Sequence, residues 1–208
     1  MLDARLRPLL ARPLEAVTRL VDRRWITPDG LTLAGLALGM GSAVAAALQW
    51  WAVAAILWLV SRLADGLDGT LARRRARASG SSGSHAGGFL DITADFVVYG
   101  STVVGVAIGA TAAFDAPWWP FLLVLLAYYV NGTAFLAFSS IAERADRRID
   151  DGRSLSFLGG LAEATETIVV HTLWLVVPQW AAWIAVGWAA VVGISATQRI
   201  VAGYRALR

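Results

Sequence analysis

Six long apolar stretches constrain the fold of this chain more than any other feature of its sequence. A helix needs about 20 predominantly apolar residues to cross a membrane, and soluble domains rarely gather apolar residues into such blocks. The stretches cover approximately residues 31–49, 51–77, 87–113, 120–141, 158–177 and 181–203. We therefore expect an all-α, polytopic membrane protein whose six transmembrane helices form one membrane domain over residues 27–208.

Residues 1–26 predict a separate element at the membrane surface. Leu14, Val17, Val21 and Trp25 recur at steps of three and four residues, with arginines elsewhere around the helix. An amphipathic helix of this kind lies in the plane of the lipid headgroups. The alternative is a positively charged cytoplasmic flank without that helix.

The placement of arginine predicts the topology. All 18 basic residues are arginines, and none lies in the short links near residues 49–51, 112–119 and 178–180. They lie instead in the N-terminal flank, in residues 62–77 and 144–153, and at the C-terminal end. Because positive charge favours the cytoplasmic side, we expect a multi-pass protein of the cell membrane with both termini in the cytoplasm.

Four aspartates mark the cytoplasmic ends of the second and third stretches. Asp65 and Asp68 are three residues apart and Asp91 and Asp95 are four apart, so each pair projects from one face of a helix. The second stretch is about 40 Å long as a helix, against about 30 Å of hydrocarbon, which places its carboxylates at the interface. One such aspartate would be an ordinary interfacial charge, whereas four together indicate a functional site.

Carboxylates gathered in this way repel one another unless cations lie between them. The chain has no cysteine and only two histidines, so the expected metal is a hard ion held by oxygen, such as Mg²⁺ or Mn²⁺. Gly69, Ala72 and Gly87 are small residues that let a substrate or another helix approach closely. Arg73 could make a charge-assisted contact with a phosphate.

The residues from Asp65 to Asp95 resemble the signature of the CDP-alcohol phosphotransferase (CDP-alcohol phosphatidyltransferase) family. The pattern reads Asp65-x-x-Asp68-Gly69-x-x-Ala72-Arg73, then Gly87-x-x-x-Asp91-x-x-x-Asp95. The resemblance implies an enzyme of phospholipid biosynthesis that moves a phosphatidyl-type group from a CDP-linked lipid donor, first of all CDP-diacylglycerol, to a small alcohol and releases CMP. Thirteen residues separate Arg73 from Gly87, more than is usual in the family.

The resemblance also implies roles for individual residues. Asp95 would be the base that takes the proton from the acceptor hydroxyl. The aspartates that would hold a pair of divalent ions are Asp65, Asp68, Asp91 and Asp95. The residues implied at the CDP-donor site are Asp29, Gly30, Gly69, Ala72, Arg73, Ser84 and Gly87. Counting back from Asp91 favours Ser84 over Ser79 as the loop serine of that site, and homodimers are common in the family.

The alcohol acceptor is left open. Glu163 and Glu166 would favour an acceptor that bears an amine, such as serine or a choline-like alcohol, unless they are solvated or pair with the arginines of residues 144–153. Those arginines, Arg153 among them, would instead suit a phosphorylated acceptor such as glycerol phosphate or inositol phosphate. Asn131 lies inside the fourth stretch, where it predicts a hydrogen bond between helices.

Two other classes of membrane protein also place acidic residues in or near the membrane. Intramembrane prenyltransferases also use aspartate-rich motifs with Mg²⁺, but they lack the Asp-Gly-x-x-Ala-Arg pattern. A cation channel or transporter would place its charges near the midplane, within broken helices, whereas here the charges lie at one end. No feature of the chain indicates binding to nucleic acid.

Overall fold

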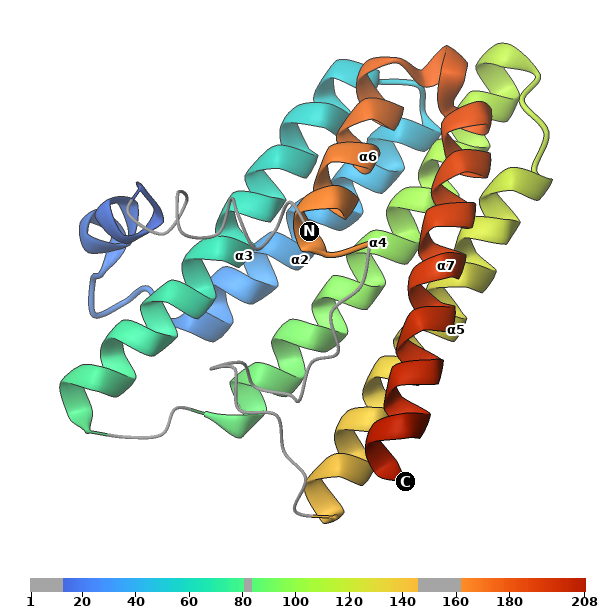
Figure 1. Ribbon diagram of the computed structural model, residues 1–208. Coiled ribbons are helices and arrows are strands. Elements are labelled where there is room, and N and C mark those ends of the chain that lie inside the picture. Colours follow the sequence, from blue (N-terminus) through green and yellow to red (C-terminus); the bar gives the residue numbers. More distant parts are fainter. Residues whose placement is uncertain (1–12, 81–83, 146–161) are drawn as a thin grey trace.

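The structure is a computed structural model that describes residues 13–80, 84–145 and 162–208. Within these ranges the chain is helical and contains no strand, which confirms the predicted all-α class. A short helix covers residues 13–21. The elements that follow are α2 (Pro28–Ala47), α3 (Trp51–Ser79), α4 (His85–Phe114), α5 (Trp119–Arg144), α6 (Ala164–Val176), the 3-10 turn η1 (Pro178–Trp180) and α7 (Ala181–Leu207) (Figure 1).

Four of the described helical segments are long and apolar enough to cross a membrane. They are Pro28–Ala47, His85–Phe114, Trp119–Arg144 and Pro178–Leu207. Helix α3 has 29 residues, but it carries charged residues from Arg62 onward. Helix α6 has 13 residues, or about 20 Å, which is short of the hydrocarbon thickness. Six spans therefore stay a prediction, as does the membrane-surface position of the N-terminal helix.

The ends of the helices follow from local sequence. Thr27 caps α2 because its side chain accepts a hydrogen bond from the Gly30 amide, and Pro28 occupies the first turn, where no amide hydrogen is needed. Helix α3 ends at Gly80, which has a φ of 67°. Such a left-handed conformation is easily adopted by glycine.

Helix α2 lies between α3 and α4 and contacts both closely. The Ser42 hydroxyl donates to the Ala54 carbonyl at 2.8 Å, and Ser61 donates to the Gly35 carbonyl at 2.7 Å. On the other side, a Cβ added at Gly105 of α4 would meet the backbone of α2. The three helices therefore pack through small residues and buried hydrogen bonds, as is usual for helices in membranes.

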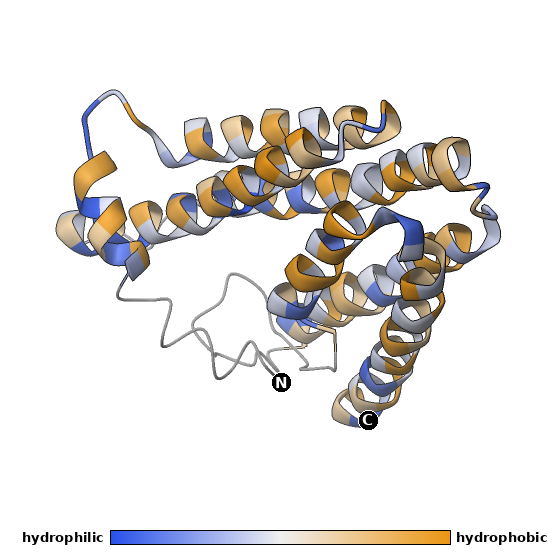
Figure 2. Cartoon of the chain, turned by 90° about the horizontal axis from the view of Figure 1, so that it is seen from above, coloured by the Kyte–Doolittle hydropathy of each residue, from blue (hydrophilic) through white to orange (hydrophobic). Residues whose placement is uncertain are grey.

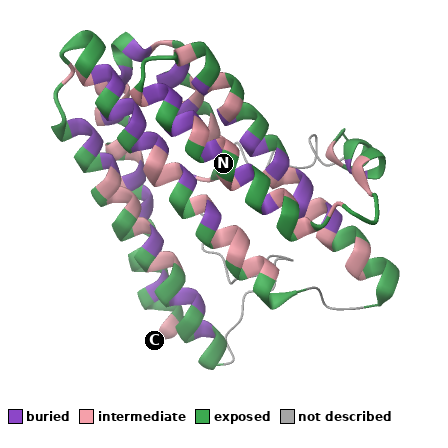
Figure 3. Cartoon of the chain, turned by 180° about the vertical axis from the view of Figure 1, so that it is seen from behind, coloured by how far each residue is buried: buried purple, intermediate pink, exposed green. Residues whose placement is uncertain are grey.

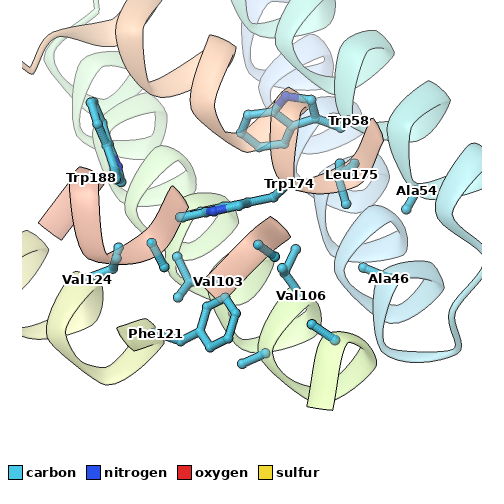
Figure 4. Packing of buried hydrophobic residues seen from close by; sticks show 14 of the residues in the cluster. Ala46, Ala54, Trp58, Val103, Val106, Phe121, Val124, Trp174, Leu175 and Trp188 are labelled. Atoms are coloured by element: carbon cyan, nitrogen blue, oxygen red, sulfur yellow. The ribbon is translucent and has the colours of Figure 1, made fainter. Parts of the chain in front are cut away.

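Large aromatic side chains join this group to α5, α6 and α7. Figure 4 shows Trp174 of α6 between Trp58 of α3 and Phe121 of α5, and all three are buried. The Tyr128 hydroxyl lies 2.8 Å from His171 Nε2 and accepts a hydrogen bond from Trp188 Nε1. The core is thus apolar but includes a polar chain that joins three helices.

A partly buried hydrogen bond also connects α5 to α7. Arg199 donates to the Asn131 side-chain oxygen at 3.0 Å. This confirms the predicted interhelical hydrogen bond of Asn131.

The outer surface of the bundle is apolar, as a lipid-facing surface would be. Figure 2 shows hydrophobic residues along all the helices, and Figure 3 shows exposed residues on their outward sides. Exposed examples are Val44, Ile56, Leu126 and Trp183. Figure 1 shows the three arginine-free links at one end of the bundle, and the end of α3, the start of α4, the end of α5 and the C-terminus at the other. The arginine-free links therefore lie together at one end of the bundle, as predicted.

Candidate active site

Three of the four signature aspartates converge. Asp65 and Asp68 on α3 and Asp91 on α4 each offer a carboxylate oxygen, and these atoms all lie within 4.8 Å of one another. Helices α3 and α4 meet here because both pack against α2. Closely spaced carboxylate oxygens are the ligands that Mg²⁺ and Mn²⁺ favour, so the donor set fits the expected ion.

Helix α2 contributes a hydroxyl to this group. Thr32 donates a hydrogen bond from Oγ1 to Asp68 Oδ2. Both residues are buried, and the bond holds the carboxylate in a single orientation. Thr32 is not among the residues that the sequence predicts for the site.

Asp95 lies one helical turn beyond Asp91 and pairs with a cation. Its Oδ1 atom lies 2.6 Å from Arg62 Nη1, and the Arg62 side chain is only 5% exposed. The same nitrogen lies 3.8 Å from Asp65 Oδ1. Arg62 is one of the arginines that predict the topology. A charge one turn before Asp65, within an otherwise apolar stretch, is also typical of a functional site.

Four of the residues expected at the donor site, Asp29, Gly30, Ser84 and Gly87, lie at the starts of α2 and α4. A Cβ added at Gly87 would lie 3.2 Å from Asp29 Oδ1 and 3.7 Å from the Ser84 hydroxyl. Ser84 caps α4 by accepting a hydrogen bond from the Gly87 amide. Gly30 lies in the first turn of α2. Two helix N-termini, whose amides favour anions, thus lie together here.

Gly69, Ala72 and Arg73 follow Asp68 along α3. The Arg73 guanidinium folds back over Gly69, so that a Cβ at position 69 would lie 3.1 Å from Nη1. Arg73 is exposed and Ala72 is partly buried. A side chain at position 69 would therefore displace the guanidinium from its present place.

The residues suggested for the acceptor lie elsewhere in the chain. Glu163 is the residue that precedes α6, and Glu166 lies in its first turn. Glu166 lines a cavity of about 330 Å³ that is otherwise apolar and lies between α6 and α7. Arg153 lies outside the described residues. Neither glutamate belongs to the group of three aspartates.

The N-terminal helix is held against the C-terminal part of α3. Asp22 accepts hydrogen bonds from Arg75 at 2.8 Å and from Arg74 at 3.0 Å. These guanidinium groups hold the pKa of Asp22 below its ordinary value of 3.8. Leu14 lies beside Gly66, within the signature, where a Cβ would come 3.4 Å from it.

Comparison with known proteins identifies the family. A family model described as CDP-alcohol phosphatidyltransferase matches residues 25–195. The chain belongs to this family. It is an enzyme of the class that transfers phosphatidyl groups in phospholipid biosynthesis, and the match includes every signature residue.

Two curated relatives are similar over most of their length. The inner membrane protein YnjF of Escherichia coli is 38% identical over 214 residues, which cover 100% of this chain and 98% of that protein. Archaetidylinositol phosphate synthase of Pyrococcus horikoshii is 32% identical over 155 residues, or 70% of this chain and 78% of that protein. The apolar helices and the similarity to an inner membrane protein identify a protein of the cell membrane.

Solved structures share the fold. The phosphatidylinositol phosphate synthase of Mycobacterium tuberculosis with CDP-DAG bound superimposes with a TM-score of 0.72 at 21% identity, over 93% of this chain and 94% of that one. The same protein in complex with manganese and citrate gives a TM-score of 0.71 at 21% identity, over 92% and 88%. At this identity the likeness concerns the fold.

Proposed function

We propose that this enzyme transfers a phosphatidyl group from CDP-diacylglycerol to a small alcohol and releases CMP, with a divalent metal at the site. The observation that carries the proposal is the convergence of Asp65, Asp68 and Asp91 within a family signature. A site at the cytoplasmic interface suits a donor whose lipid chains lie in the bilayer and whose nucleotide lies in water. We place both termini on that side.

The four signature aspartates are assigned to a pair of Mg²⁺ or Mn²⁺ ions. A bound divalent ion supplies positive charge to the donor diphosphate, where phosphoryl transfer builds up negative charge. Asp65, Asp68 and Asp91 already lie close enough to share an ion. Asp95, the fourth signature aspartate, lies one helical turn beyond Asp91 and is assigned to the same pair of ions.

Asp95 is also assigned as the base. It takes the proton of the acceptor hydroxyl while the acceptor oxygen forms a bond to the phosphorus that bears the diacylglycerol. The bond from that phosphorus to the bridging oxygen breaks, and this oxygen leaves with CMP. The Asp95 side chain is 32% exposed, so a water-soluble alcohol can reach it, and general-base catalysis contributes typically about 10²–10⁴-fold.

The donor is recognised at the N-terminal ends of α2 and α4. Asp29, Gly30, Ser84 and Gly87 lie at these helix starts, and we assign them to the nucleotide. Gly69 and Ala72 give the nucleotide space along α3. We assign Arg73 to a phosphate of the donor, because its guanidinium folds back over Gly69, the residue that follows Asp68.

A phosphorylated polyol is the acceptor to test first. Archaetidylinositol phosphate synthase, one of the relatives, takes its name from such a product. Arg153 and its neighbours would hold the acceptor phosphate. An acceptor that bears an amine is the second candidate, because Glu166 is a carboxylate beside a cavity of about 330 Å³. A homodimer is proposed from family resemblance.

The test is release of CMP by the purified protein. CDP-diacylglycerol and Mg²⁺ are supplied with inositol phosphate, glycerol phosphate, serine or choline in turn. We expect CMP with one acceptor, and we expect Asp95→Asn to abolish it while the thermal unfolding curve is unchanged. Undiminished CMP from the Asn variant would show that the base is another group. No CMP with any acceptor would overturn the choice of donor.

A further inference from the structure

A guanidinium is buried beside the proposed metal site. The Arg62 side chain is 5% exposed, and Nη1 lies 2.6 Å from Asp95 Oδ1 and 3.8 Å from Asp65 Oδ1. Nη2 donates to the Ser61 hydroxyl at 3.1 Å. A buried charge is costly unless it is paired and hydrogen-bonded, so this arrangement places the charge of Arg62 against the carboxylates.

Aromatic rings hold the guanidinium in place. Its central carbon lies 5.2 Å from the ring centre of Trp58 and 5.0 Å from that of Tyr99. Trp58 is itself fixed, because its Nε1 donates to the Thr172 hydroxyl at 3.1 Å and its ring stacks on His171 at 4.8 Å. Residues from α3, α4 and α6 thus immobilise Arg62. Aromatic surroundings of this kind suit the planar guanidinium of arginine better than the flexible ammonium group of lysine.

The four signature aspartates form a group of three and a fourth residue, Asp95, that pairs with Arg62. Asp65, Asp68 and Asp91 come within 4.8 Å of one another, and this group does not include Asp95. The strongest contact of Asp95 is the one with Arg62. A cation supplied by the protein thus already occupies one side of the acidic cluster.

We propose that Arg62 is a positioning residue that fixes the Asp95 carboxylate for the reaction and, through its charge, limits how tightly the cluster binds a divalent ion. The inference rests on the proposed function, because it concerns the carboxylates assigned there to metal and base. It predicts two effects of opposite direction when the charge is removed.

The two effects have separate physical origins. Without the guanidinium, the carboxylates attract a divalent ion more strongly, because a positive charge within a few ångströms no longer opposes it. At the same time the Asp95 carboxylate loses the group that orients it, and a misplacement of about 1 Å can cost about 100-fold in rate. A variant that only disturbed folding would weaken both metal binding and turnover.

The experiment compares Arg62→Met and Arg62→Lys with the parent full-length protein in detergent micelles. Mn²⁺ binding is measured by electron paramagnetic resonance without substrate, and CMP release is measured at saturating CDP-diacylglycerol. Arg77→Met is the matched control, because Arg77 is an exposed arginine near the end of the same helix. Thermal unfolding of each protein in metal-free buffer reports on folding.

We expect Arg62→Met to lower the dissociation constant for Mn²⁺ by about fivefold and to lower kcat by at least about tenfold. Arg62→Lys keeps the charge, so its Mn²⁺ affinity should match the parent within about twofold while kcat is reduced. Arg77→Met should match the parent in both measurements.

The outcomes separate the inference from the proposed function. An unchanged kcat in Arg62→Met, or weaker Mn²⁺ binding together with a lower kcat, would overturn the role of Arg62. If Arg62→Met fails to fold, Arg62→Lys provides the test. Weaker Mn²⁺ binding by Arg62→Lys than by the parent, or an unchanged kcat in that variant, would then overturn the role of Arg62. A parent protein that neither binds Mn²⁺ nor releases CMP would instead overturn the proposed function.

Discussion

At the scale of single residues, Asp22 attaches the N-terminal helix to α3 through ion pairs with two arginines. Its carboxylate accepts from Arg75 and Arg74, which lie more than fifty positions further along the chain. Arg75 also donates to the Arg23 carbonyl at 2.9 Å. The helix that precedes Asp22 is therefore held next to the signature by a charge pair.

Acid should release this attachment. The pKa of Asp22 is lowered in the folded protein by Arg75 and then Arg74, so its contribution to stability is present above the ordinary value of 3.8 and is lost as the pH falls through the lowered value. We expect hydrogen exchange to show protection of residues 13–21 at pH 7 that disappears at acid pH. In Asp22→Asn the protection should already be reduced at pH 7.

A neighbouring carboxylate provides the control for this measurement. Glu15 pairs only locally in the described contacts, with Arg19 at 3.3 Å, and both side chains are more than half exposed. Glu15→Gln should keep the protection at pH 7. Equal protection in Asp22→Asn and the parent would mean that apolar contacts such as that of Leu14 hold the helix without the charge pair.

The sequence predicted some of the site residues and missed others for a physical reason. Three of the signature aspartates were expected together and are together. The contacts of Thr32 and Arg62 depend on how helices cross, since their partners lie 36 and 33 residues away. Spacing along one helix reveals which residues share a face, but it does not reveal which residue of another helix lies opposite.

At the scale of the elements, the contact between α2 and α4 depends on glycine. A Cβ at Gly109 would collide with the Ala46 carbonyl and lie 2.8 Å from the Trp51 ring. Because the obstacle includes backbone, the collision cannot be relieved by turning a side chain. The close approach of these helices is what places Asp91 near α3.

We expect Gly109→Ala to lower the thermal unfolding midpoint. Overpacking of this kind costs about 1–3 kcal/mol, which is about 2–12 °C for a chain of this size. Gly100→Ala on the same helix is the matched control, because a Cβ there meets nothing within 4 Å, and it should leave the midpoint unchanged or raise it. Equal midpoints for the two variants would contradict the packing of α2 against α4.

Most element boundaries were predictable from the apolar stretches. The predicted ranges 31–49, 51–77 and 87–113 differ by only a few residues from α2, α3 and α4, because turn residues and tryptophans mark their ends. Helix α6 begins at Ala164, several residues after the expected start at residue 158. The apolar run of residues 157–162 precedes Glu163, so hydropathy places the start of this stretch before the helix begins.

At the scale of the whole molecule, the two ends of the bundle differ in charge. The links at one end contain no arginine, and the other end carries the end of α3, the start of α4, the end of α5 and the C-terminus. This separation is the basis for the predicted topology.

Single cysteines test the orientation, since the natural chain has none. Ala78→Cys at the end of α3 and Gln179→Cys in η1 lie at opposite ends, and both positions are exposed. In intact cells, a membrane-impermeant maleimide should label Gln179→Cys, and it should label Ala78→Cys only after permeabilisation. The reverse pattern would place the aspartates on the outer side of the membrane.

The C-terminal end of α3 and the N-terminal end of α4 each have a cap of their own. Gly80 ends α3 in its left-handed conformation, and the Ser84 cap starts α4. Each helix end is therefore complete without help from the residues between them. Six of the thirteen residues between Arg73 and Gly87 extend α3, and the connection itself comprises residues 80–84. A change in the number of residues in this connection leaves the spacing of the aspartates within each helix unaltered, so it is a suitable place for an inserted epitope.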